Sequence, residues 1–344
     1  MNEDGSFGSS FGLENPVAAT TRYENNVGRN RLQGNVNARI KILPSLSFTS
    51  RVGVDVLDVR ESIFEPSVLQ SSATGRAVVG NFDNQRVVYD NFLQYIFENA
   101  ANTFNITVGT SFQEDSQEST FTESVDFPTD EFNGLSSGAQ PLTTAGEFSG
   151  DNLRSFFGNV NYNYDERFFV TASVRRDGSS RFINNRWGTF PGVSVAWRLS
   201  NESFLASGPF SDLKLRLGWG QTGNNNVGNF SSRQLFAGGN NFLDTPGTAP
   251  SQIGNPDLKW ETTTSLDFGI DFGFLNNRLN GLVNFYQKNT EDLLLNRPIP
   301  TTSGFVSVLQ NIGEVQNRGL EIELGYDIIA VSYTHLTLPT TPYV

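Results

Sequence analysis

The sequence predicts an all-β fold, specifically part of a transmembrane antiparallel β-barrel with about 11–12 strands and no helical domain. Three observations predict it. Alternation of apolar and polar residues with a period of two dominates the chain, whereas helical periodicity is nearly absent. Many alternating runs are about 9–11 residues long, the length with which a tilted strand crosses a bilayer. The connections between the runs alternate between short and long, as they do in outer-membrane barrels.

The first hairpin shows the alternation most clearly. In residues 32–42 the even positions are apolar or glycine, and the odd positions are Gln, Asn, Asn, Arg and Lys. After a turn at 43–45 the alternation resumes through residues 46–56. Further strands are predicted at 87–97, 104–112, 154–164, 168–175, 192–199, 212–220, 262–273, 278–287 and 312–328, with a weaker one at 290–296.

The connections fall into two classes. Short turns are predicted near 43–45, 98–103, 165–167 and 274–277, with a medium connection at 200–211. Long loops are predicted near 57–86, 113–153, 176–191, 221–261 and 288–311. A soluble β-sandwich has no reason to sort its connections by length, so this pattern favours a membrane barrel whose turns lie in the periplasm.

Aromatic residues support a membrane-crossing strand. Trp187 and Trp197 are ten residues apart, so they face one side of a strand that is extended throughout. Ten residues span about 33 Å along a strand, or about 23 Å of depth at a tilt of ~45°, close to the ~25 Å apolar band between aromatic girdles. Pro191 fits only near a strand start or an edge. Other aromatics flank the short turns: Phe97, Phe104, Tyr164, Phe168, Phe272 and Phe274. The alternative is the aromatic core of a soluble β protein.

The run at 262–272 predicts which face meets lipid. Its even positions include Leu266, Phe268 and Ile270, and its odd positions include Asp267 and Asp271. Because carboxylates facing hydrocarbon are costly, we expect the aspartates to point toward a polar lumen and the apolar residues toward lipid.

Composition excludes several classes of function. The 344-residue chain has no cysteine and therefore no disulfide, thiolate metal site or cysteine nucleophile. Its formal net charge of −12 argues against a nucleic-acid partner, which needs a basic face. We find no apolar run near 18 residues, so no transmembrane helix is predicted. The first ten residues are acidic and polar, unlike a secretory signal, so the protein is cytoplasmic or its true N-terminus lies upstream.

Five separated segments carry a family resemblance. They are RSFFGNVNYNYDERFFVTASVRRDGSSRF (154–182), NNRWGTFPGVSVAWRLSNESFL (184–205), LKLRLGWGQTGNNNVGNF (213–230), NPDLKWETTTSLDFGIDFGFLNNRLNGLVNFYQKNTEDLLL (255–295) and NIGEVQNRGLEIEL (311–324). In this order they resemble the barrel of SusC/RagA-type TonB-dependent transporters, from the outer membrane of Bacteroidetes-like bacteria. The resemblance covers about residues 12–330. It implies a 22-stranded barrel with an N-terminal plug, import driven by the TonB complex, and a SusD-like surface lipoprotein as partner.

Both ends depart from that family. We find no plug, TonB box or signal peptide before residue 12, so Met1 is interpreted as an internal start. Residues 1–31 are expected to form a loop-like segment leading into the barrel portion at 32–330. Residues 331–344 begin with VSYTHLTLPT, which resembles a translated transposon-end adaptor from DNA library preparation, so we expect a non-native tail. The only histidine, His335, lies in that tail.

Two motifs suggest ligand sites. Gly218, Gly220 and Gly223 match G-x-G-x-x-G after a strand, and Asp244 lies about twenty residues on. A dinucleotide site also needs a following helix, whereas NNNVGNFSS predicts a strand running into an external loop. Residues 114–151 hold nine acids and no Lys or Arg. Calcium binding is one interpretation and a solvated acidic loop is the favoured one, because no D-x-D-x-D spacing is present.

Other charged residues are assigned structural roles. Glu321 and Glu323 alternate with apolar residues and are expected to line the lumen rather than form a glycosidase pair. Arg175, Arg176 and Asp177 are expected to form an ion pair at a strand end. Without His or Cys in the authentic part, and without G-x-S-x-G or S-x-x-K, no enzyme activity, catalytic residue, cofactor or metal site is predicted.

The resemblance implies a fragment of an outer-membrane receptor that imports nutrients, with oligosaccharides as the expected substrates and peptides as the second class. Its partners would be membrane lipid, the TonB complex and the SusD-like lipoprotein. The alternative is a non-transporting outer-membrane barrel or a surface adhesin. Substrate-binding residues stay unknown at this stage, because the family's substrate contacts come from loops, plug and lid together.

Overall fold

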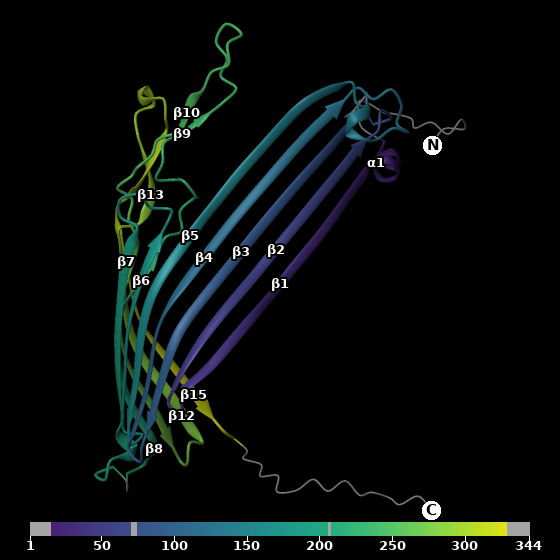
Figure 1. The fold of residues 1–344 in the computed structure, drawn as a ribbon. Coiled ribbons are helices and arrows are strands. Elements are labelled where there is room, and N and C mark those ends of the chain that lie inside the picture. The colour runs from purple at the N-terminus through teal and green to yellow at the C-terminus, as the bar shows by residue number, and fades with distance from the viewer. Residues whose placement is uncertain (1–14, 70–73, 206–207, 329–344) are drawn as a thin grey trace, which may run out of the picture.

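The computed structural model describes residues 15–69, 74–205 and 208–328. Its main feature is a tall, curved, antiparallel sheet of 11 strands in which sequence neighbours pair in order (Figure 1). The strands are β1 (Glu24–Leu43), β2 (Leu46–Glu65), β3 (Arg76–Glu98), β4 (Asn102–Val125), β5 (Gln140–Tyr164), β6 (Phe168–Ser179), β7 (Trp187–Arg198), β8 (Phe210–Asn224), β11 (Glu261–Phe274), β12 (Leu279–Glu291) and β15 (Glu314–Tyr326). The all-β, barrel-type fold is confirmed.

The connections carry the remaining elements. Two-stranded sheets are formed by β9 (Leu235–Ala237) with β10 (Ala249–Gln252), and by β13 (Leu294–Pro298) with β14 (Ser307–Asn311). Short 3-10 turns lie at Leu135–Ser137, Leu199–Asn201 and Thr301–Ser303. Within the described ranges, no helix is long and apolar enough to cross a membrane.

One helix, α1 (Pro16–Arg22), precedes the sheet. Its start follows helix-capping rules, because the Asn15 side chain accepts hydrogen bonds from the backbone N–H groups of Val17 and Ala18, and Pro16 occupies the first turn. β1 then begins at Glu24. The expectation of a loop-like segment over residues 1–31 is therefore wrong for 16–31, whereas residues 1–14 lie outside the described residues.

Five strands, β1 to β5, are 20–25 residues long, about twice the predicted length. Residues 57–65, 76–86, 113–125 and 140–153 were predicted as loops and instead extend these strands. The physical reason is that apolar alternation marks only the part of a strand with one face in an apolar environment. Beyond that part the regular alternation is lost, since β4 and β5 become largely polar and the ends of β2 and β3 carry the buried Phe64 and Ala77, while the backbone pairing continues.

The four shortest turns lie at one end and the two longest connections at the other, as predicted, although the 199–209 connection at the first end is longer than the 66–75 and 180–186 connections at the second. The short turns between β1 and β2, β3 and β4, β5 and β6, and β11 and β12 lie at the lower end of Figure 1. In the β5–β6 turn, Asp165 and Glu166 have φ of 49° and 52°, the left-handed pair that a tight hairpin turn needs. The longest connections, 225–260 and 292–313, carry the two small sheets at the upper end.

A compact apolar cluster fixes the upper connections. It consists of Phe182, Phe190, Val227, Leu258 and Trp260, all less than a tenth exposed. The Trp260 ring lies 5.6 Å from Phe182 and 5.4 Å from Phe190 between centroids, and its Nε1 donates to the Arg186 carbonyl at 2.9 Å. The cluster joins the 180–186 and 225–260 connections to the end of β7.

Gly223 makes room for this cluster, and its substitution gives a test. A Cβ at Gly223 would overlap the Phe190 ring, so Gly223→Ala is expected to cost about 1–3 kcal/mol of unfolding free energy through overpacking. Gly238→Ala is the matched control, because a Cβ there meets no atom. Denaturant midpoints of the two variants measure the difference, and equal midpoints would contradict the packing described for Phe190.

Candidate functional site: an apolar belt and a polar face

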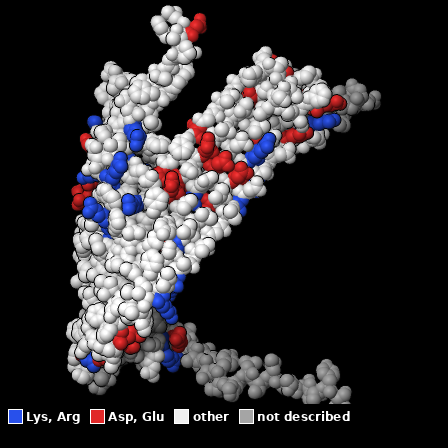
Figure 2. Space-filling view, in the orientation of Figure 1, with Lys and Arg blue, Asp and Glu red and all other residues white. Residues whose placement is uncertain are grey.

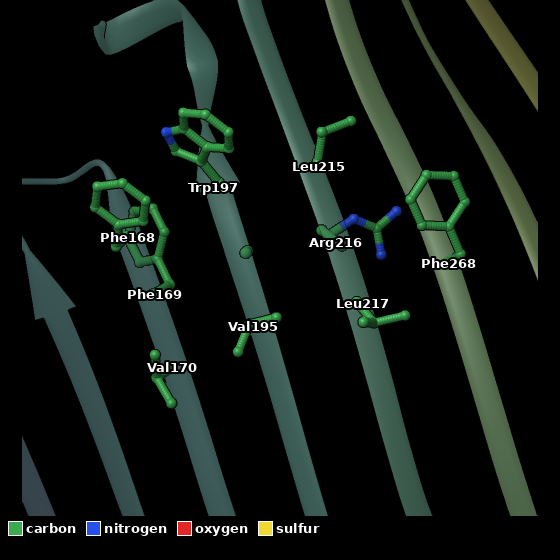
Figure 3. Close-up of a pocket in the computed structure, with 10 residues that line it drawn as sticks. Phe168, Phe169, Val170, Val195, Trp197, Leu215, Arg216, Leu217 and Phe268 are labelled. Atoms are coloured by element: carbon green, nitrogen blue, oxygen red, sulfur yellow. The ribbon is translucent and has the colours of Figure 1, made fainter.

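One face of the sheet carries rows of large apolar side chains. Across the strands, Phe268 on β11 lies opposite Leu217 on β8, Leu217 opposite Val195 on β7, and Val195 opposite Val170 on β6. Figure 3 shows these side chains together with those of Phe168 and Trp197. Phe268, Leu217 and Val195 remain 43–48% exposed, so they are not a protein core. A continuous exposed apolar surface of this kind is the part of a barrel that contacts lipid.

This apolar belt ends at a definite height. Its upper margin carries one polar residue of the same face on each strand: Asn30, Asp58, Gln85, Glu114, Arg154, Arg176, Thr189, Gln221, Thr264, Gln287 and Arg318. Within the belt, Ser50, Asn91 and Thr110 form one uncharged polar row across β2, β3 and β4. Figure 2 likewise shows charged side chains in a band across the upper half of the molecule, above a belt almost free of them.

Aromatic rings mark both margins of the belt. Near the short turns, Phe168 lies 6.5 Å from Tyr164 and stacks on Trp197 at 5.6 Å. Near the upper margin Phe156 stacks on Trp187 at 5.9 Å. β7 is extended from one tryptophan to the other, so both lie on the apolar face, as their spacing predicts. Pro191 has a strand partner on one side only. It lies opposite Val174 of β6, whereas pairing between β7 and β8 begins one residue later, at Gly192, so Pro191 occupies an edge position, where proline is tolerated.

The opposite face is polar and its charges are paired. Arg216 on β8 donates two hydrogen bonds to Asp271 on β11, at 2.9 and 2.8 Å. Gly269 leaves room for this pair, since a Cβ there would lie 2.7 Å from the guanidinium. Asp267 and Asp271 therefore lie on the polar face and Phe268 on the apolar one, as the alternation predicts.

Glu321 and Glu323 on β15 also lie on the polar face, opposite Asn284 and Leu282 of β12. Their apolar neighbours Leu320, Ile322 and Leu324 are 62–67% exposed on the other face. This agrees with a polar lining role.

A row of alternating charges crosses the polar face above the belt. Arg31 on β1 bonds Asp55 on β2 at 2.6 Å, Asp55 lies opposite Arg86 on β3, and Arg86 bonds Asp115 on β4 at 2.6 Å. Nearer the strand ends, Arg76 is held between Glu123 and Glu65. The hydrogen bond to Glu123 is the main reason that the pKa of Arg76 lies above its usual value.

The row ends in a polar pocket under the 225–234 connection. Arg86, Asp115, Asp151, Arg181, Asn229 and five further residues line it. Arg181 bonds Asp151 at 3.0 Å, and Asn229 donates to the Ser149 hydroxyl at 2.8 Å. Two arginines balance two aspartates. Three buried side-chain atoms have no hydrogen-bond partner: Asp115 Oδ1, Arg181 Nε and Asn229 Oδ1. Such atoms are costly to leave unpaired, which makes this pocket the candidate polar site on the lumen side of the described sheet.

The predicted acidic loop is corrected by this arrangement. Six of its nine acids lie on strands: Glu114, Asp115, Glu118, Glu123, Glu147 and Asp151. Asp130, in the 126–139 connection, accepts hydrogen bonds from the Ser67 backbone and hydroxyl. Among the described residues no group of three or more acidic or His side chains is arranged to hold a metal ion. The calcium interpretation gains no support.

The two remaining motifs are resolved as structural. Gly218, Gly220 and Gly223 all lie within β8, and the chain then enters a long connection without a helix, so the nucleotide interpretation fails. Arg175 bonds Asp177 at 2.8 Å on the polar face, which confirms the predicted ion pair. Arg176 points to the opposite face and does not join it. The polar pocket was missed, because its residues come from five separate segments with no common sequence signal.

A sheet with an exposed apolar belt between aromatic margins on one side and paired charges on the other defines a transmembrane β-barrel. A family profile described as "TonB dependent receptor-like, beta-barrel" matches residues 2–343. The chain belongs to this family, and it is an outer-membrane protein of SusC/RagA type.

Individual relatives agree with this assignment. The chain is 35% identical to TonB-dependent receptor P39 of Formosa agariphila over 302 residues, covering 83% of this chain and 28% of that protein. It is 33% identical to TonB-dependent receptor SusC of Bacteroides thetaiotaomicron over 324 residues, covering 90% and 32%. A solved structure of the RagAB peptide transporter superposes with a TM-score of 0.84 at 30% identity, covering 92% of this chain and 36% of that chain. The chain thus spans about a third of the length of these relatives.

Proposed function

We propose that the protein carrying this chain imports a nutrient, an oligosaccharide, across the outer membrane through a polar lumen. Import is powered by the TonB complex, and a SusD-like lipoprotein is the surface partner. The main support is the two-sided sheet in a TonB-dependent family: an apolar belt toward lipid and a charge-paired face toward the lumen. No catalytic role is proposed.

The polar pocket supports an uncharged substrate rich in hydroxyl groups. Its charged residues balance, so it offers no net attraction to an ion, while its unpaired atoms are two acceptors and one donor. A sugar hydroxyl both donates and accepts, so it suits the mixture of donors and acceptors that the amide, carboxylate and guanidinium side chains of the pocket offer.

Uptake by cells tests the proposal. Deleting the gene is expected to abolish protonophore-sensitive uptake of a labelled oligosaccharide mixture, and restoring the complete gene should recover it. Unchanged uptake of both oligosaccharides and peptides after deletion would contradict import and favour the non-transporting barrel or adhesin.

Peptides are the second candidate substrate, because the RagAB structures that resemble this chain are described as those of a peptide transporter. A labelled peptide mixture offered to the same cells separates the two. Loss of peptide uptake alone would replace oligosaccharide by peptide and leave import standing.

A pocket variant tests the substrate contacts. Asn229→Ala removes one unpaired acceptor and the bond to Ser149, so oligosaccharide uptake is expected to need about three- to tenfold more substrate for half-maximal rate. Asn240→Ala is the control, because Asn240 lies in the exposed part of the same long connection and bonds only local backbone. Equal effects of both variants would remove the pocket from the substrate path.

Residues 1–344 expressed alone are expected to transport nothing. In the described sheet β1 pairs only with β2 and β15 only with β12, so two edges carry unpaired backbone groups. Each such group costs several kcal/mol in hydrocarbon. Energy-dependent uptake by cells that express only these residues would contradict this expectation.

A further inference from the structure

Two arginines occupy an unusual place on the lipid-facing side. Arg154 on β5 and Arg176 on β6 are the first residues above the apolar belt on their strands, and both are exposed. The Arg154 guanidinium lies 5.6 Å from the Phe156 ring, and that of Arg176 lies 5.4 Å from the Trp187 ring. Among the described residues no carboxylate lies within ion-pair distance of either guanidinium, although Arg175, next in sequence, bonds Asp177.

The register brings the two guanidiniums together. Arg176 lies opposite Phe156 and Arg154 lies opposite Gly178, so the arginines are diagonal neighbours on adjacent strands. Diagonal neighbours have backbones about 7–8 Å apart, within which two long side chains reach one common ligand. The stacked rings of Phe156 and Trp187 hold both guanidiniums at this margin.

A shallow apolar groove lies directly below the pair. It is lined by Val108, Gly158, Val160, Ala172 and Val174, together with Asn159 and Ser173, whose positions in the alternation belong to the polar face. Gly158 and Ala172 are the small residues between larger neighbours on β5 and β6, and they create the hollow. It runs down the apolar belt and therefore lies in the hydrocarbon layer. A single molecule with an anionic head and an apolar chain fits both features.

We propose that Arg154 and Arg176 bind the phosphate of an outer-leaflet lipid whose acyl chain lies in the groove over Gly158 and Ala172. Guanidinium groups match phosphate oxygens with paired hydrogen bonds, and arginine is the preferred residue for this geometry. A cation on the lipid face is tolerated near the membrane interface, where an anionic headgroup supplies its counter-charge. The site lies outside the lumen and is independent of the imported substrate.

Lipid binding to the purified gene product tests this site. Native mass spectrometry with dioleoyl phosphatidic acid as the probe measures its dissociation constant. Replacing both residues, Arg154→Gln with Arg176→Gln, is expected to weaken binding about 30-fold, or about fivefold for each cation near an anionic lipid surface. The control is Arg318→Gln. Arg318 lies on the lipid-facing side of β15 at the same margin, but among the described residues it has no aromatic partner. This variant should change binding less than twofold.

A second variant tests the groove and does not touch the charges. Ala172→Leu fills the hollow, so binding of dioleoyl phosphatidic acid should weaken severalfold while binding of a short-chain phosphatidic acid is unchanged. Unchanged lipid binding in the double arginine variant would overturn the proposal. Displacement of the lipid by equimolar inorganic phosphate would overturn it in favour of a free-anion site. Loss of self-association together with unchanged lipid binding would assign the surface to a second copy of the protein.

Discussion

Phe268→Arg is expected to destabilise the protein by about 2–4 kcal/mol, the cost of an arginine at the midplane of a barrel's lipid face. Phe268 lies in the apolar belt between Leu217 and Phe285 on the neighbouring strands, and the residue is 43% exposed. The arginine has no aqueous face to reach from this position. Urea unfolding of the gene product in phospholipid vesicles measures the loss.

Thr264→Arg is the matched control on the same strand and face. Thr264 lies two positions above Leu266, at the belt margin, where its hydroxyl accepts a hydrogen bond from Gln221. An arginine there reaches the interface, so the expected cost is about 0–1 kcal/mol. Equal costs at positions 264 and 268 would show that the face has no apolar belt.

Phe182→Ala is expected to cost about 3–5 kcal/mol, because it leaves a cavity at a fully buried aromatic position. The phenyl ring packs against Trp260 in the apolar cluster, and the surrounding connections are too constrained to close the space. Thermal or denaturant unfolding of the gene product gives the value.

Phe236→Ala serves as its control, because Phe236 lies in the same set of upper connections and is 60% exposed. It should cost less than about 0.5 kcal/mol, the usual range for surface substitutions. A similarly small loss for Phe182→Ala would mean that the cluster does not stabilise the upper connections.

The apolar belt could be predicted from the sequence because lipid on one side and water on the other impose a period of two. The strand containing Asp267 and Phe268 has this pattern, and the structure places the two residues on opposite faces. The placement of Trp187 and Trp197 on one face likewise follows from their even spacing in an extended strand. The short turns, such as that at Asp165 and Glu166, follow from their place between two alternating runs.

The strand ends beyond the apolar belt and the polar pocket could not be predicted in the same way. Asp115 and Asp151 were assigned to a loop, although they are paired opposite each other on β4 and β5, because a strand that is polar on both faces has no periodic signal. The polar pocket depends on register between distant strands and on the 225–234 connection. The position of Arg176 could not be predicted either. Its proximity in sequence grouped it with Arg175 and Asp177, which lie on the polar face, whereas Arg176 lies on the apolar face.

The orientation of β11 in the membrane is the most direct test of the transmembrane barrel. Residues 1–344 contain no cysteine, so a Cys introduced at position 268 or 267 of the gene product is the single cysteine in this part of the barrel. In folded protein in vesicles, Phe268→Cys should react with a lipid-confined thiol reagent and resist a water-soluble one, and Asp267→Cys should do the reverse. Equal labelling of both positions by the water-soluble reagent would contradict a lipid-facing belt on this strand.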